Sequence, residues 1–163
     1  MKDNAVALRK LIFDMAKEAG KIHLKYFRTN KIGVKIKEVY EGGAEDFVTK
    51  VDKMVEKKIV DIIKKSKMNC KIISEESGEL VFGKADYTWI IDPIDGTHGY
   101  SIGNSNFCVA IALMKADRPL MGLLYWPVWN DLYFAENGKG AFLNGKRIHV
   151  SNETEMKKSR IAF

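Results

Sequence analysis

Two aspartates near the middle of the chain, Asp92 and Asp95, have the side chains and the spacing of a metal site. They follow an apolar run that begins at Trp89 and is typical of a buried strand, and Pro93 and Ile94 separate them. Burying carboxylates at a strand end is costly unless cations or hydrogen bonds compensate. Oxygen ligands on a rigid turn are what a Mg²⁺ ion requires. The segment therefore predicts a metal site.

Gly96 and Thr97 come directly after the aspartates and indicate that an anion binds there too. Pro93 cannot donate to a strand ladder, so we expect the strand to stop there and the Ile94 carbonyl to serve as a neutral metal ligand. Gly96 allows a phosphate to approach the backbone closely. If Thr97 opens a helical turn, its N–H and that of Gly96 can hold phosphate oxygens, and its hydroxyl can bond to an attacking water. The alternative is a purely structural pair of turns, Asp-Pro and then Asp-Gly.

Asp52 is a further candidate ligand, because it projects from the apolar face of a predicted helix. It lies four residues after Val48 and three before Val55. A carboxylate in that position needs a partner. Thr49 and Asp52 also fit a capping box, in which Asp52 accepts a backbone N–H in the first helical turn. The residues alone leave the capping role and the metal role equally open.

Glu75 and Glu76 follow a predicted short strand at 71–74. Adjacent residues of an extended chain point to opposite sides, so at most one of the two is expected to face the Asp92 turn. A solvated loop is the default interpretation of such a pair on its own. Only the surrounding motifs favour a role in metal binding.

Four segments, in this order, resemble the inositol monophosphatase superfamily of Mg²⁺-dependent, lithium-sensitive phosphatases. They are 46–52 together with Glu56, 73–78, 92–97 and 138–145. The resemblance implies Mg²⁺ as the cofactor, with Mn²⁺ as a substitute and Li⁺ as an inhibitor. It also implies an α+β fold in which two long helices pack on a mostly antiparallel sheet.

The resemblance assigns a role to each acidic residue. Glu75 would bind metal and help to polarise the attacking water, while Glu76 would lie at the surface or support the ligands. Asp92 and Asp95 would bridge two ions. Asp52 would bind the second ion directly or through water.

The reaction implied is the hydrolysis of a small phosphomonoester by water that the bound ions activate. Inositol monophosphate, a sugar phosphate and 3′-phosphoadenosine 5′-phosphate are the candidate substrates. The continuation from His98 to Tyr100 departs from many inositol monophosphatases and looks closer to the bisphosphate nucleotidase branch. His98 would therefore meet a second phosphate or a base, or else face solvent in a turn.

The resemblance covers nearly the whole chain but only the first part of the family's usual length. Family members continue into an α/β domain that supplies a further aspartate, and no similar Trp-Asp-x-Ala-Ala-Gly segment occurs here. We therefore predict a single metal-binding domain, 1–163, whose activity alone is weak or incomplete. Expected partners are a small phosphorylated metabolite, and either a second copy or a separately encoded C-terminal half. The alternative is a non-catalytic family domain that binds a metal or a protein.

Apolar periodicity predicts the elements that would position these residues. Helices are expected at 4–28 and 47–66. Short strands are expected at 71–74, 87–92, 106–114, 120–126 and 131–135, followed by a hairpin at Asn144 and Gly145. Residues 34–40 read as a strand or hairpin arm and 41–45 as a flexible acidic loop. His23 lies beside the apolar stripe of the first helix and reads as a packed or partly exposed structural histidine.

The composition excludes several other classes of protein. With 46% hydrophobic and 29% charged residues and 3 prolines, the chain is globular, and no apolar run approaches the ~20 residues of a membrane span. The absence of a signal-type block predicts a cytoplasmic protein. The isolated Cys70 and Cys108 predict two reduced, buried thiols. The net charge of +6 comes mostly from scattered lysines, which favours a solvated surface that attracts anions and argues against nucleic-acid binding.

Overall fold

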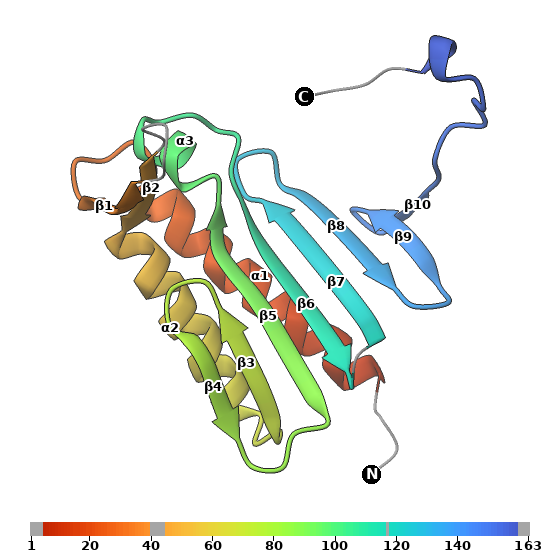
Figure 1. Ribbon diagram of the computed structural model, residues 1–163, viewed down its shortest axis with the longest axis horizontal. Helices are drawn as coiled ribbons and strands as arrows, with labels where there is room; N and C mark the ends of the chain where they lie inside the picture. The colour runs from red at the N-terminus through yellow and green to blue at the C-terminus, as the bar shows by residue number, and fades with distance from the viewer. Residues whose placement is uncertain (1–4, 40–44, 117, 160–163) are drawn as a thin grey trace.

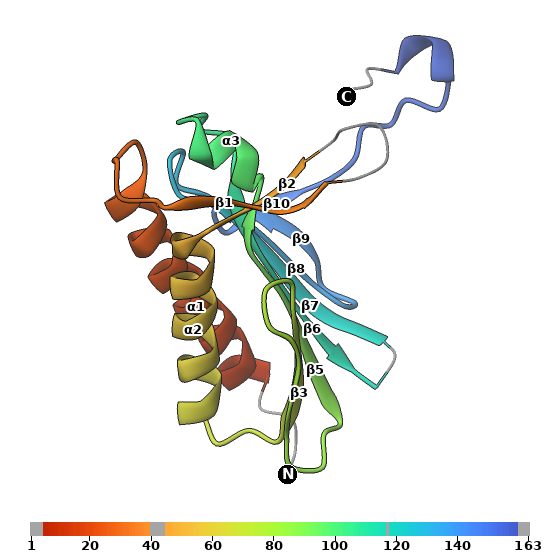
Figure 2. The same ribbon diagram turned by 60° about the vertical axis from the view of Figure 1, so that its left-hand side comes forward.

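Two helices lie side by side on one face of an eight-stranded sheet in the computed structural model, which describes residues 5–39, 45–116 and 118–159. Helix α1 spans Ala5–Tyr26 and helix α2 spans Lys50–Lys65. Figure 2 shows both helices on the same side of the sheet, with the opposite face uncovered by any described helix. The predicted α+β class is therefore confirmed.

The large sheet has the strand order β10-β9-β8-β7-β6-β5-β3-β4 (Figure 1). Its strands are β3 (Cys70–Ser74), β4 (Gly78–Phe82), β5 (Tyr87–Asp95), β6 (Cys108–Lys115), β7 (Arg118–Trp126), β8 (Asp131–Glu136), β9 (Gly140–Leu143) and β10 (Lys146–Ile148). All neighbours are antiparallel except β3 and β5, which are parallel. Sequence periodicity missed β4, whose side chains are mostly exposed and therefore carry little apolar pattern.

The core lies between the helices and the sheet. Helix α1 contributes its predicted stripe, with Ile12 and Met15 fully buried, and α2 contributes Val55 and Ile59. Trp89 on β5 is fully buried beneath them. Strand β5, which carries the two aspartates, packs against the helices. Its end is therefore held in a fixed position relative to both of them.

The start of the second helix differs from its prediction. Residues 47–49 belong to strand β2 (Glu45–Thr49), which pairs with β1 (Val34–Val39) in a separate two-stranded sheet, and α2 begins only at Lys50. Thr49 has extended backbone angles and caps the helix, so the helix cannot begin before it. The strand at 34–40 is confirmed over the residues described, whereas residues 41–44 of the predicted acidic loop lie outside them.

Strand β5 does not end at Pro93, which contradicts the prediction made from the sequence. It continues to Asp95 through a β-bulge in which Pro93 and Ile94 lie opposite the single residue Val109 of β6. A bulge is one of the few places in a sheet that accept proline, because the local ladder is already interrupted. The bulge turns the strand end so that the two aspartates no longer follow simple alternation.

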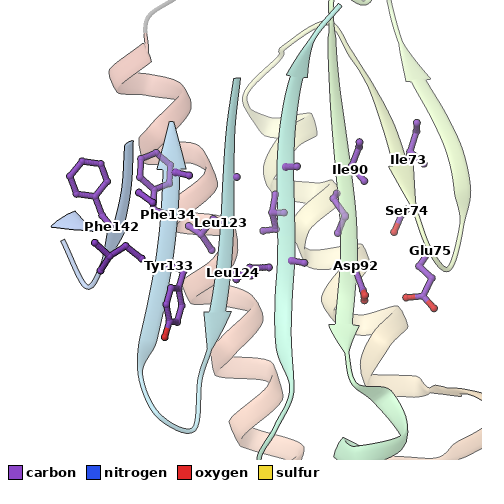
Figure 3. Close-up of a pocket in the computed structure, with 18 residues that line it drawn as sticks. Ile73, Ser74, Glu75, Ile90, Asp92, Leu123, Leu124, Tyr133, Phe134 and Phe142 are labelled. Atoms are coloured by element: carbon purple, nitrogen blue, oxygen red, sulfur yellow. The ribbon is translucent and has the colours of Figure 1, made fainter. Parts of the chain in front are cut away.

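A groove of about 650 Å³ crosses the uncovered face of the sheet. Its middle is lined by small residues on β6 and β7, including Ala110, Ala112 and Gly122, and Ile90 and Tyr133 lie toward its two sides. Figure 3 shows the apolar side chains projecting from this face, with acidic side chains at one end. The apolar groove thus leads to the strand end that carries the candidate ligands.

Cys70 and Cys108 are both free and buried, as predicted. None of the helices in the described part of the chain has the length and apolar character needed to cross a membrane.

Candidate active site

A pocket of about 270 Å³ lies at the end of β5 and gathers most of the residues singled out by the sequence. It is lined by Phe47, Glu75, Asp92, Ile94, Asp95, Gly96, Thr97 and His98. Asp52 does not line the pocket but reaches its edge by contacting Thr97. The structure therefore brings together residues from β2, α2, β5 and the segments that follow β3 and β5.

Glu75 and Asp92 are neighbours because β3 and β5 run parallel. Ser74 is paired with Ile91, and the Glu75 N–H donates to the Ile91 carbonyl at 3.2 Å, so the next residue of each strand lies at the same level. Figure 3 shows their two carboxylates at the same end of the groove. This is the adjacency that the metal prediction required.

Asp92 carries a half-buried carboxyl group that a bound cation would stabilise. Its Oδ1 is buried and has no hydrogen-bond partner among the described residues. Burial, together with the charges of Glu75 and Asp95, raises the pKa of Asp92 to about 8. A divalent cation in the pocket would compensate both the burial and the repulsion.

Asp52 performs the capping role that its spacing had left open. It is 1% exposed, and its Oδ2 accepts hydrogen bonds from the Thr49 N–H at 2.7 Å and the Thr49 hydroxyl at 2.6 Å. Its Oδ1 lies 3.2 Å from Thr97 Oγ1. Burial raises the pKa of Asp52. The capping box is therefore confirmed, while binding of a second ion stays a prediction.

Thr97 occupies a central position beside the bulge. It opens the short helix α3 (Thr97–Ser101), as its predicted role required, and its Oγ1 lies 2.7 Å from the Ile94 carbonyl. The Ile94 carbonyl, expected to be available to a metal, thus already accepts one hydrogen bond and has one lone pair left. Because the hydroxyl has a single hydrogen, donation to Ile94, at the shorter distance, excludes simultaneous donation to Asp52 and leaves the oxygen able to accept from a third group.

Gly96 is required here by the conformation of the backbone. Its φ is +91°, in the left-handed region, and a Cβ at this position would lie 2.9 Å from the Asn106 carbonyl oxygen. The chain therefore turns from β5 into α3 at a point where no side chain fits.

Replacing Gly96 with alanine should lower the free energy of unfolding by more than the about 1–3 kcal/mol expected from left-handed backbone strain alone. Gly138 is a matched control, since its φ is +74° and a Cβ there meets nothing within 4 Å. Urea unfolding of G96A and G138A isolates the cost of the close approach to Asn106. Equal losses in the two variants would contradict the predicted clash.

Lys37 is a site residue that the sequence analysis missed. Its Nζ lies 3.1 Å from Glu75 Oε1 and 3.3 Å from Glu76 Oε1. Glu75 and Glu76 lie in a turn after β3, where strand alternation no longer applies, so both reach the same ammonium group. The Glu76 side chain is only 6% exposed, which excludes the surface alternative. In the sequence, the i, i+2 spacing of Lys35 and Lys37 in the predicted strand could have indicated that both lysines lie on one face of it.

Glu56 anchors the turn that carries Glu75. Its carboxylate accepts hydrogen bonds from the hydroxyl of Ser74 and from both the hydroxyl and the N–H of Ser77. Glu56 lies one helical turn after Asp52, so one face of α2 holds two loops of the site. That i, i+4 spacing of buried acids is visible in the sequence, although its partners are not.

Asp95 and His98 form the outer part of the pocket. Asp95 is exposed, and the Cys108 thiol donates to its Oδ2 at 3.7 Å. Burial and the charge of Asp95 raise the pKa of Cys108 to about 12, so this thiol stays protonated. The His98 ring stacks on Phe47 with centroids 4.7 Å apart, which places an aromatic wall beside Gly96.

The candidate ligands surround one pocket without yet converging on one point. Among the residues that the structure describes, no three His, Cys, Asp or Glu side chains form a ready-made metal cluster. Two effects keep the ligands apart. Lys37 binds the Glu75 carboxylate, and the acidic side chains repel each other when no cation lies between them. The donor set is nevertheless entirely oxygen and includes the unpartnered Oδ1 of Asp92, which fits a hard cation such as Mg²⁺.

Comparison with known proteins identifies the family of this chain. Residues 5–162 match the sequence model of the inositol monophosphatase family. The chain belongs to the inositol monophosphatase family. The resemblance seen in its motifs is therefore confirmed.

Several known proteins are similar to nearly all of this chain. The fructose-1,6-bisphosphatase/inositol-1-monophosphatase of Aquifex aeolicus is 34% identical over 94% of the chain. The Nus factor SuhB of Haemophilus influenzae is 38% identical over 90% of it. Among solved structures, the SuhB protein of Bartonella henselae superposes with a TM-score of 0.83 at 30% identity, over 90% of this chain and 55% of that one.

The chain spans little more than half the length of the curated relatives it matches. It covers 58% of the Aquifex protein and 54% of the Haemophilus protein. Family membership thus applies to these 163 residues, whereas the activity of the full-length relatives does not transfer without further argument.

Proposed function

We propose that this chain takes part in the Mg²⁺-dependent hydrolysis of a small phosphomonoester. The observation that carries the proposal is the pocket at the end of β5, where Glu75, Asp92 and Asp95 meet Thr97 in a member of a phosphatase family. An entirely oxygen donor set with a partly buried, cation-deficient carboxylate favours magnesium or manganese over softer metals. Lithium is the proposed inhibitor.

Glu75, Asp92 and Asp95 would hold the cation, together with the remaining lone pair of the Ile94 carbonyl. Asp52 would contribute to a second ion at the pocket edge. When bound, such ions lower the pKa of a water molecule and neutralise charge on a transferring phosphate. Lys37 would have to release Glu75 or remain as a further positive charge beside the phosphate.

The remaining residues of the pocket orient the reactants. Thr97 Oγ1, fixed between Asp52 and Ile94, would accept a hydrogen bond from the attacking water. The backbone N–H groups of Gly96 and Thr97 would hold phosphate oxygens, and the absence of a Cβ at Gly96 allows close approach. The His98 ring, stacked on Phe47, would bound the leaving-group side.

A phosphorylated inositol or sugar is the proposed substrate class. The Aquifex relative is named for fructose-1,6-bisphosphate and inositol-1-phosphate, and a tomato relative, 39% identical over 90% of this chain, is named inositol monophosphatase 1. The exposed His98 would favour substrates that carry a second phosphate near the rim. A 3′-phosphoadenosine 5′-phosphate substrate is the alternative within the same chemistry.

Assays of phosphate release should show slow turnover by the chain alone and faster turnover when the polypeptide corresponding to the unmatched part of its relatives is added. The reason is that one ion and the leaving-group side have few ligands among the residues described. Inositol phosphate, fructose bisphosphate and adenosine bisphosphate are the test substrates, with EDTA and Li⁺ as inhibition controls. Fast turnover by the monomeric chain alone would contradict the prediction that its site is incomplete. No turnover in any combination would refute the proposed phosphatase activity.

The groove on the uncovered sheet face supports a second candidate role, that of a non-catalytic binding module. Leu124 and Tyr133 are 38% and 36% exposed there, and exposed apolar patches of this kind mark interaction surfaces. Magnesium binding without turnover, even after complementation, would favour this role over catalysis.

A further inference from the structure

We propose that His23 on helix α1 is a positioning residue that fixes the β5 bulge and so sets the direction of the candidate metal ligands on either side of it. This inference rests on the proposed function, because it concerns the same carboxylates. His23 is not among the residues that line the pocket. It would act through Pro93, between Asp92 and Asp95.

The bulge creates the need for such a residue. Two residues of β5, Pro93 and Ile94, lie opposite one residue of β6, so the regular ladder is interrupted there. A buried carbonyl outside a ladder needs another donor. The Ile94 carbonyl accepts from Thr97, and the Pro93 carbonyl accepts from His23 Nε2 at 2.9 Å.

The His23 ring can only act as a donor in this contact. A carbonyl oxygen accepts and never donates, so Nε2 must carry the proton. Burial lowers the pKa of His23 to about 4, which leaves the ring neutral at pH 7. The ring is 0% exposed and lies 5.6 Å, centroid to centroid, from the Phe107 ring in an edge-on arrangement. Packing therefore allows the imidazole little freedom to turn away from Pro93.

Packing alone does not explain a histidine at this position. Its Nδ1 is buried without a partner among the described residues, which costs stability. An aliphatic side chain would fill the same space without that cost. The polar contact to Pro93 is the feature that an aliphatic residue would lack.

A second contact couples the same turn of α1 to the other end of the segment. The Tyr100 hydroxyl, on α3, donates to the His23 carbonyl at 2.9 Å. One residue of α1 is thus bonded to Pro93 before Asp95 and to Tyr100 after Thr97. In Figure 1 the end of α1 lies beside α3 and the end of β5, which is consistent with these two contacts.

The test compares the variants H23L, which removes the donor, and H23Q, whose amide nitrogen can reach near the position of Nε2. I12V is the matched control, since Ile12 is equally buried on α1 but far along the helix from the bulge. Magnesium affinity is measured by calorimetry, and amide hydrogen exchange at residues 95–97 by NMR. H23L should weaken magnesium binding about tenfold and speed exchange at 95–97. H23Q should recover most of both, and I12V should change neither.

Equal magnesium affinity in folded H23L and wild type would overturn the proposal. If H23L does not fold, H23N replaces it, because the shorter amide cannot reach Pro93. The comparison of H23Q with H23N then decides in the same way. If the wild-type chain binds no magnesium, the proposed function loses its metal site, while exchange at 95–97 still decides the positioning role. Unchanged exchange in H23L or H23N would then overturn it.

Discussion

Replacing Thr97 with alanine should reduce kcat by about 10²-fold or more, measured with the complementing polypeptide present, while magnesium affinity changes little. The substitution removes one hydroxyl and one methyl group and leaves Glu75, Asp92 and Asp95 in place. The Thr97 hydroxyl is held between Ile94 and Asp52, so its direction is set before any water binds. An interaction that matters most as water attacks should appear in kcat rather than mainly in KM.

Thr97→Ser is the matched control, because it keeps the hydroxyl and removes only the methyl group. It should retain most of the wild-type kcat. Near-normal kcat in T97A would show that another group orients the water, and the assigned role would be wrong even if the metal site were right. A parallel fall in T97A and T97S would instead assign the effect to the methyl group.

Replacing Asp92 with asparagine should abolish magnesium binding as measured by calorimetry. The change replaces a carboxylate ligand, whose Oδ1 is buried and has no partner among the residues described, with a neutral amide. Asp61→Asn is the control, because Asp61 is an aspartate on the outer face of α2 that pairs with Lys57. It should bind magnesium like wild type. Equal binding by D92N and wild type would refute the ligand assignment.

The pH dependence of magnesium binding gives the same prediction a second readout. Because the pKa of Asp92 is raised to about 8, its carboxyl is mostly protonated at pH 7 without a cation. Binding should then release a proton, and affinity should rise between pH 6 and pH 9. Calorimetry in buffers of different ionisation enthalpy measures the released proton. The D61N control should show the same proton release.

The sequence was sufficient to predict the layers of the fold and the neighbourhood of the site. Regular apolar spacing predicted α1 from residues such as Ile12 and Met15, which are fully buried. The Thr49 to Asp52 spacing predicted the capping box that is present. The family resemblance selected Glu75 as the acid that lies near Asp92, and the parallel pairing of β3 with β5 brings the two together.

Other features depended on contacts that no local pattern encodes. Pro93 indicated the end of a strand, but the bulge opposite Val109 accommodates it, and this can be seen only once β6 is in place. Lys37 and His23 read as a surface lysine and a structural histidine, because their partners lie 38 and 70 residues further along the chain. Strand β4 carries too little apolar pattern to be recognised before β3 pairs with it.

The parallel pairing of β3 and β5 has a consequence for the energetics of the whole chain. Glu75 and Asp92 are brought together by that pairing, and Asp52 comes from a helix packed beside it, so no short segment contains the complete set of ligands. An ion held by ligands from these separate segments can bind only the folded chain. By mass action it would stabilise the fold by roughly 2.7 kcal/mol at a free concentration about a hundred times Kd. The melting temperature of the protein would then depend on how much magnesium is present.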